Sequence, residues 1–152
     1  MMSVRTKIRT ILVVLSSVWF TSCGVKPLYS EYHDLPIQGW HMDSALHYEW
    51  SIADTAQRYN TYIYLRHSER YKYQNVWLFL NGGQDTIEFY VADDRGRWLG
   101  ENTNGYIETS VWLEEGFRFD SVGTYTLDIQ QGMRDTVLKG ITSVGIEVYG
   151  QK

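Results

Sequence analysis

The stretch that decides the fold of this chain is Tyr59-Asn60-Thr61-Tyr62-Ile63-Tyr64-Leu65-Arg66-His67. Thr61, Ile63 and Leu65 alternate in it with the larger, partly polar Tyr62, Tyr64 and Arg66. Successive side chains of a β-strand point to opposite faces, so this period of two predicts a half-buried strand. The sequence on both sides repeats the same kind of signal.

Two neighbouring segments extend the pattern. Residues 46–52 alternate in the same way, with Leu46, Tyr48, Trp50 and Ile52 on one face. Residues 76–80 (Val-Trp-Leu-Phe-Leu) are apolar on both faces, which predicts a central strand covered on each side. The turn signal Asn81-Gly82-Gly83-Gln84 follows and predicts a hairpin.

The remaining strands are expected at 86–92, 106–113, around 117–119, at 124–130 and at 144–149, with a second turn at Asp93-Asp94-Arg95-Gly96. The total of roughly eight or nine short strands is typical of a two-sheet antiparallel β-sandwich, jelly-roll or immunoglobulin-like. Composition agrees with an all-β fold: aromatic residues make up 15% of the chain, and there are Gly 13 but only Pro 2.

The first 22 residues are typical of a secretory signal peptide. Arg5, Lys7 and Arg9 precede a short apolar run, and small polar residues follow it. The run is about half the length that a bilayer-spanning helix needs. The segment ends at Cys23, the chain's only cysteine, and Phe20-Thr21-Ser22-Cys23 resembles the lipobox of bacterial lipoproteins. We therefore predict that Cys23 is the lipidated N-terminus of the mature protein; a plain signal peptide that ends near a free cysteine is the alternative.

This interpretation divides the chain into a signal peptide (1–22), a lipidated N-terminus and tether (23–36) and a β-sandwich domain (37–152). Removing the three cations of the signal peptide from the formal charge of −4 leaves the mature chain near −7. An acidic surface disfavours nucleic acid and direct adhesion to anionic lipid headgroups, so acyl chains on Cys23 are expected to supply the contact with the bilayer.

Clusters that could carry chemistry are weak. His41, Asp43 and His47 lie in one short stretch, but their spacing matches no common metal site and no cysteine remains to complete a zinc set. Asp85, Asp93 and Asp94 favour a turn over a calcium loop. Glu114 and Glu115 point to opposite faces of a strand and cannot flank one glycosidic bond. We therefore expect no enzyme activity, no metal and no cofactor.

Aromatic side chains are the remaining candidates for a site, because tryptophan rings can stack on sugars. Trp50 and Trp77 fall in strand patterns that predict core positions. Trp40, Trp98 and Trp112 are less committed to the core and are the candidate contacts for a partner or a glycan.

An ordered set of short motifs runs through the mature chain. It comprises Leu35-Pro36 with Gly39-Trp40, Tyr59-Asn60 leading to Leu65-Arg66, Tyr73-Gln74-Asn75-Val76-Trp77-Leu78, Asp85-Thr86, Ala92-Asp93, Gly96-Arg97-Trp98-Leu99-Gly100, Gly123-Thr124-Tyr125, Met133-Arg134, Leu138-Lys139-Gly140-Ile141 and Val144-Gly145-Ile146. With the lipobox, this set resembles the GldH family of gliding-motility lipoproteins. Glu101-Asn102-Thr103-Asn104 departs from the further glycines usual there, and the turn at 81–84 is shorter than usual.

The resemblance implies a membrane-anchored accessory of the gliding apparatus, which works with the type IX secretion system and other envelope proteins. It implies no enzymatic activity, and Cys23 is the one functional residue that it carries over. The short Gly24-Val25-Lys26 segment lacks an acidic surface-export run, which favours the periplasmic side of the outer membrane. A glycan-binding envelope lipoprotein is the alternative.

Overall fold

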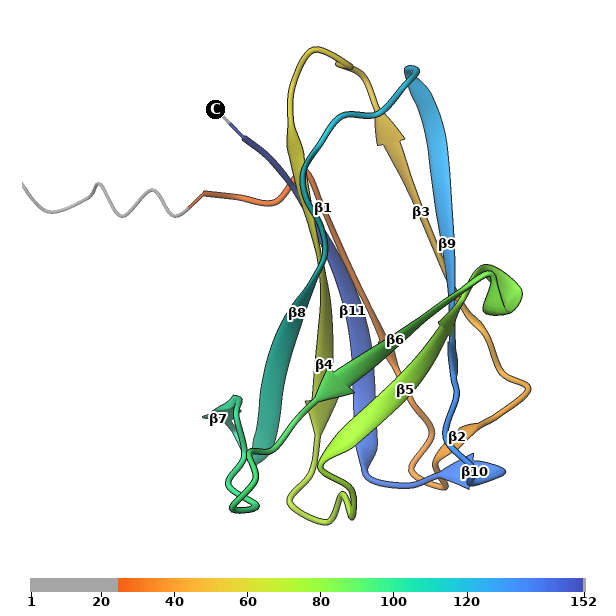
Figure 1. The fold of residues 1–152 in the computed structure, drawn as a ribbon, viewed down its shortest axis with the longest axis vertical. Coiled ribbons are helices and arrows are strands. Elements are labelled where there is room, and N and C mark those ends of the chain that lie inside the picture. Colours follow the sequence, from red (N-terminus) through yellow and green to blue (C-terminus); the bar gives the residue numbers. More distant parts are fainter. Residues whose placement is uncertain (1–24, 152) are drawn as a thin grey trace, which may run out of the picture.

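The computed structural model describes residues 25–151, and these form an antiparallel β-sandwich (Figure 1). The strands are β1 (Tyr29–Asp34), β2 (Trp40–His41), β3 (Leu46–Ile52), β4 (Tyr59–His67), β5 (Asn75–Leu80), β6 (Asp85–Tyr90), β7 (Glu101–Thr103), β8 (Tyr106–Phe117), β9 (Gly123–Gln131), β10 (Val137–Leu138) and β11 (Ile141–Gly150). Between 25 and 151 the sole helical element is a short 3-10 turn, Asn81–Gly83. None of the helical structure in this range is long and apolar enough to cross a membrane.

Two main sheets form the layers of the sandwich. The larger sheet has the order β1-β11-β4-β8-β7, and the smaller one has the order β3-β9-β5-β6. Strands β10 and β2 form a separate short ladder. Figure 1 shows β3 and β9 on the right, in a layer separate from that of β4, β11 and β8 on the left. The two-sheet antiparallel sandwich expected from the sequence is therefore confirmed.

The core lies between the sheets and is built from the alternating residues. Ile63 and Leu65 of β4 are fully buried, as is Ile146 of the neighbouring β11. Leu78 of β5 and Ile129 of β9 are buried to the same extent in the facing sheet. Burying each of these side chains stabilises the fold by about 1.5–3 kcal/mol. Because the side chains of β4 alternate, burial of Ile63 and Leu65 turns Tyr62 and Tyr64 away from the core.

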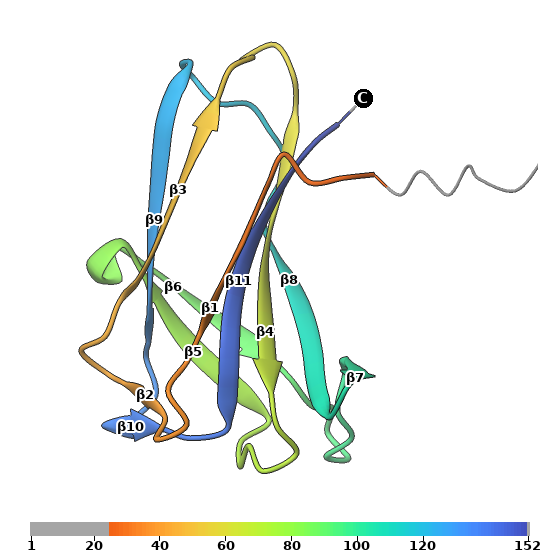
Figure 2. The same ribbon diagram turned by 180° about the vertical axis from the view of Figure 1, so that it is seen from behind.

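The segment expected to be a tether contributes a strand. Residues Tyr29–Asp34 pair with β11 along their whole length, from Tyr29 opposite Val148 to Asp34 opposite Ser143. The folded part therefore begins at Tyr29 rather than at residue 37. Both views show β1 running beside β11, with the ends of the described chain at the same end of the sandwich (Figures 1 and 2).

Strand β5 does not match the expectation of a strand covered on both faces. It lies between β9 and β6, but its burial alternates, and Trp77 and Phe79 remain 39% and 38% exposed. The smaller sheet has a layer on one side only, so its outward residues face solvent. The expectations of a doubly covered β5 and of a core position for Trp77 were wrong.

Connections between strands are short. The Asn81–Gln84 segment links β5 and β6 as a hairpin, with positive φ at Asn81, Gly82 and Gly83. Strand β8 continues to Phe117, so no separate strand forms around 117–119. The short strands β2, β7 and β10 were not expected from the sequence.

Candidate functional site

The outward face of the five-stranded sheet carries a continuous group of aromatic rings. We call it the aromatic face, and its members are Tyr32 of β1, Tyr62 and Tyr64 of β4, Trp112 of β8 and Tyr149 of β11. Successive side chains of a strand alternate between its two faces, and each of these rings lies on the face turned away from the smaller sheet. Trp112 is the most open of the described tryptophans, at 49% exposed.

The strand register brings the rings together. Tyr62 lies opposite Trp112 on one side and opposite Glu147 on the other. The ring centroids of Tyr62 and Trp112 are 4.6 Å apart, and the Tyr149 ring meets Tyr62 edge-on at 5.7 Å. Tyr64 joins the group at 6.2 Å from Tyr62 and 6.0 Å from Tyr32. These spacings are those of interacting aromatic pairs, so the rings support one another.

Gly145 makes room for one of these rings. It lies between Tyr32 and Tyr64 in the cross-strand register. A Cβ atom at this position would approach Cδ1 of Tyr32 to 2.4 Å. The absent side chain allows the Tyr32 ring to lie against the β11 backbone.

Glu147 ties the polar ends of this face together. Its Oε1 accepts hydrogen bonds from Ser30 Oγ at 3.0 Å and Tyr32 OH at 3.3 Å, and its Oε2 accepts one from Tyr149 OH at 2.5 Å. Burial, followed by the bond to Glu147, raises the pKa of Tyr149 far above the ordinary range. The hydroxyl group therefore stays protonated and the ring uncharged at neutral pH.

Arg66 lies at the edge of the aromatic face, near two surface hollows. Its guanidinium carbon lies 4.4 Å from the Tyr32 ring centroid, a cation–π contact, and its Nε donates to Oε2 of Glu108 at 2.5 Å. Beside this pair is a hollow of about 320 Å³ lined by Tyr64, Glu101, Glu108 and Ser110, among others. A second hollow of about 450 Å³ is lined by Arg66, Asp34 and Ser143, among others.

The three candidate tryptophans have different environments. Trp112 belongs to the aromatic face. Trp40 is 1% exposed, and its Nε1 donates to the Ser44 carbonyl at 2.7 Å, so the expectation that it contacts a partner was wrong. Trp98 is half-buried, with its ring 4.5 Å from that of His67. The predicted lipid site, Cys23, lies outside the described residues.

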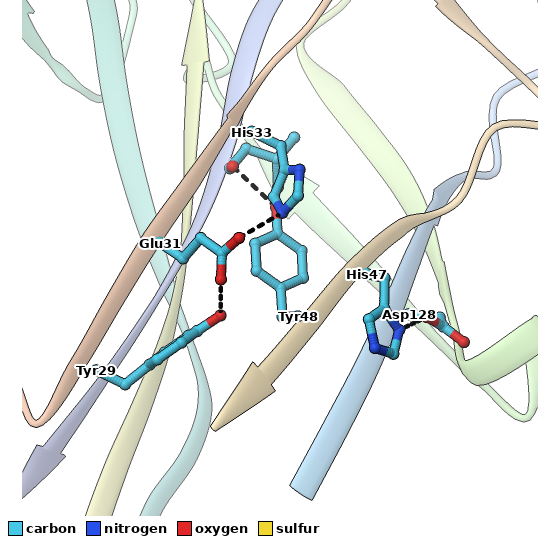
Figure 3. Close-up of polar contacts among 7 residues, drawn as sticks. Tyr29, Glu31, His33, His47, Tyr48 and Asp128 are labelled. Carbon is cyan, nitrogen blue, oxygen red and sulfur yellow. Dashed lines mark hydrogen bonds and ion pairs between the residues drawn. The ribbon is translucent and has the colours of Figure 1, made fainter. Parts of the chain in front are cut away.

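Other polar groups gather where β1 meets β3. Figure 3 shows Tyr29, Glu31 and His33 on the side of β1 that faces Tyr48 of β3. Tyr29 donates to Oε2 of Glu31 at 2.5 Å, and Nε2 of His33 lies 3.1 Å from Oε1 of the same carboxylate. The His33 ring meets Tyr48 edge-on at 4.7 Å. These contacts close the gap between the two edge strands.

The residues considered for metals take structural roles. His47 pairs with Asp128 at 2.6 Å across the β3–β9 ladder (Figure 3). Asp93 accepts hydrogen bonds from the backbone of Arg95 and Arg97 and from the Arg97 guanidinium, which lowers its pKa and shapes the turn. Within residues 25–151 no three His, Cys, Asp or Glu side chains gather as a metal ion would require.

Sequence reasoning found Trp112 but missed the tyrosines around it. They alternate with buried residues and therefore look like the outer side of ordinary strands. Their proximity depends on β4 lying between β11 and β8, a long-range pairing that no local pattern reports.

Comparison with known proteins identifies relatives of this sandwich. The model of the GldH lipoprotein family matches residues 27–148. This chain belongs to the GldH lipoprotein family. The match begins just before β1 and ends in β11, so it includes both sheets and every member of the aromatic face except Tyr149.

Two curated relatives align over almost their whole length. The "Gliding motility lipoprotein GldH homolog" of Christiangramia forsetii is 31% identical, over 95% of this chain and 96% of the relative. The "Gliding motility lipoprotein GldH" of Flavobacterium johnsoniae is 26% identical, over 90% and 93%. No solved structure shows significant similarity to the chain.

Proposed function

We propose that this GldH-family protein is a lipid-anchored, non-enzymatic accessory of bacterial gliding motility and of the type IX secretion machinery associated with it. The observation that carries the proposal is the family match across residues 27–148, together with full-length relatives named for gliding motility. Its partners are other envelope proteins of the gliding or secretion apparatus and the bilayer itself.

The anchor is Cys23, acylated after removal of residues 1–22. Five residues, 24–28, separate Cys23 from Tyr29, the first residue of β1. Because each residue spans at most about 3.3–3.6 Å, this connection holds the sandwich within about 20 Å of the lipid. The short, non-acidic Gly24-Val25-Lys26 segment supports a location on the periplasmic side of the outer membrane.

A non-enzymatic role is supported by the way the polar groups are used. His47 pairs with Asp128, Arg66 pairs with Glu108, and Glu147 accepts hydrogen bonds from three hydroxyl groups. Each of these contacts fixes two strands or two side chains relative to one another. The described surface is therefore organised for holding and contacting rather than for proton transfer.

The test is deletion of the gene in its own host, followed by rescue with the wild-type gene. Colony spreading and the amount of type IX cargo in the medium are the two measurements. We expect both to fall in the deletion strain and to recover on rescue. Normal spreading together with normal secretion in the deletion strain would refute the proposal.

The alternative function is glycan binding, and only one of the three candidate tryptophans still supports it. Trp40 is buried and Trp98 packs on His67, whereas Trp112 lies on the aromatic face. The neighbouring tyrosines, which the sequence did not single out, give this alternative a different and larger surface.

A further inference from the structure

We propose that the aromatic face is a binding site for an uncharged polysaccharide chain. This role goes beyond that of a gliding accessory and does not depend on it. The face of the sheet around Tyr62 and Trp112 carries the proposal. Its composition, size and charge each restrict what can bind there, and its rigidity favours binding.

Composition is the first restriction. Three rows of paired residues cross the outward face: Asp34–Ser143–Arg66–Glu108, Tyr32–Gly145–Tyr64–Ser110 and Ser30–Glu147–Tyr62–Trp112. These rows contain no aliphatic side chain, although obligate protein interfaces are strongly apolar. They combine aromatic rings with hydroxyl, carboxylate and guanidinium groups. A pyranose ring presents C–H groups on its face and hydroxyl groups at its edge, which matches this combination.

Size is the second restriction. Tyr149, Tyr62 and Trp112 lie on three adjacent strands, β11, β4 and β8. Adjacent strands are about 4.8 Å apart, so these rings span about 10 Å across the sheet. That width fits two consecutive sugar residues. Tyr64 and the hollow beside Glu101 and Ser110 extend the surface toward β7, giving a longer chain further contacts.

Charge is the third restriction. Asp34, Glu108 and Glu147 lie in the rows of the face, and Glu101 pairs with Glu108 from β7. Arg66 is the one cation in the three rows and is already paired with Glu108. The excess of carboxylates disfavours phosphate- or uronate-bearing polymers and nucleic acid. An uncharged glycan pays no such penalty, and carboxylate oxygens accept hydrogen bonds from sugar hydroxyls.

Rigidity favours binding by this face. The hydroxyl groups of Tyr32 and Tyr149 are bound to Glu147, and the Tyr62 ring is held between Trp112 and Tyr149. Rings that are already ordered lose little side-chain entropy when a ligand covers them. The exposed Trp77 of β5 pairs with no other aromatic ring among the described residues, and only its backbone N–H is bonded, to Met133 Sδ at 3.3 Å.

The experiment is isothermal titration of the full-length lipoprotein, solubilised in a detergent without sugar groups. The probes are four neutral hexasaccharides (cellohexaose, laminarihexaose, xylohexaose and chitohexaose), and the charged probe is hexagalacturonate. We expect at least one neutral probe to bind and the galacturonate to bind at least tenfold more weakly. Trp112→Ala and Tyr62→Ala should each weaken the binding at least tenfold. Trp77→Ala removes another exposed tryptophan, from the other sheet, and should leave binding unchanged.

Several outcomes would overturn the proposal. One is the absence of binding by all four neutral probes at millimolar concentration, with circular dichroism showing a folded protein. A preference for the galacturonate, or an equal loss in Trp77→Ala and Trp112→Ala, would do the same. If no sugar binds and Trp112→Ala instead releases an envelope protein that co-purifies with the wild type, the face is a protein interface. Rescue of spreading by Trp112→Ala would leave the accessory role intact, so the two proposals can fail separately.

Discussion

At the scale of single residues, the molecule is shaped by positions where one side chain decides the arrangement of several others. Glu147 collects three hydroxyl groups, and Gly145 leaves the space that the Tyr32 ring occupies. On the opposite side of the same sheet, His67 is fully buried. Its Nδ1 lies 3.1 Å from the Ser68 carbonyl, and its Nε2 has no hydrogen-bond partner among residues 25–151. Gly145 and His67 each lead to a measurable consequence.

Replacing Gly145 with alanine should destabilise the protein by about 1–3 kcal/mol. The new Cβ would lie 2.4 Å from the Tyr32 ring, which must move away from Glu147 and Arg66. Urea unfolding followed by fluorescence measures the change. Ser110→Ala, an exposed position in the same row, is the control and should change the midpoint little. A variant as stable as the wild type would show that Tyr32 does not depend on this space.

Acidification should weaken the fold through His67. Burial lowers the pKa of this imidazole below its ordinary value of about 6.5, so the unfolded chain takes up the proton more readily than the folded one. The free energy of unfolding should therefore fall as the pH drops below about 6.5, and be unaffected by this group above that pH. We expect His67→Phe to lose less stability than the wild type between about pH 7.5 and about pH 5.

Urea midpoints at the two pH values give this comparison. His41→Gln, at an exposed histidine, is the matched control and should keep the wild-type pH dependence. Equal pH dependence in His67→Phe and the wild type would exclude His67 as a source of acid sensitivity.

At the scale of elements, local alternation was a reliable guide where only one face of a strand is apolar. Strands β3 and β4 begin and end where the pattern predicted, because most of their inward residues are apolar and their outward ones carry polar groups. Strand β1 escaped notice because Glu31 and His33 point inward, so its alternation carries no hydrophobic signal. Strand β5 was predicted to be covered on both faces for the opposite reason: Trp77 and Phe79 make its solvent-facing side apolar.

The candidate site could be predicted only in part for a related reason. Trp112 could be recognised as a tryptophan that no strand pattern assigned to the core. Its neighbours Tyr62 and Tyr149, however, belong to strands that are distant in sequence. The order β11-β4-β8 follows from long-range pairing, which decides which outward side chains meet. Trp40 was misassigned because its burial depends on the short β2–β10 ladder and on the Ser44 carbonyl.

Hydrogen exchange tests whether β1 belongs to the folded domain. Alternate amides of Tyr29–Asp34 that face β11 should be protected against exchange, whereas residues 25 and 26 should exchange at once. The measurement is amide exchange by NMR on the full-length protein, with buried β4 as the internal reference. Complete exchange of all six β1 amides within the dead time would restore the tether interpretation of this segment.

At the scale of the whole molecule, the sandwich places the start of β1, and with it the connection to Cys23, next to the end of β11. The family match spans this architecture from residue 27 to residue 148. We expect acylation of Cys23 to hold this sandwich, and the aromatic face with it, close to the lipid as one unit. Two predictions concern this unit.

The mature protein should begin at a lipid-modified Cys23. Intact-mass and peptide mass spectrometry of the protein from its host should find acyl groups on this residue and no peptides from residues 1–22. Cys23→Ala should accumulate as the unprocessed precursor, while Ser22→Ala, which keeps a small residue before the cysteine, should be processed normally. An unmodified mature protein that starts at another residue would contradict the assignment.

Colony spreading of a deletion strain that carries Cys23→Ala shows whether gliding motility needs the sandwich to be held at the lipid. We predict that the wild-type gene restores spreading and that Cys23→Ala, present at an equal protein level, does not. Full spreading with the Cys23→Ala protein would contradict the account, because the domain would then work without its anchor.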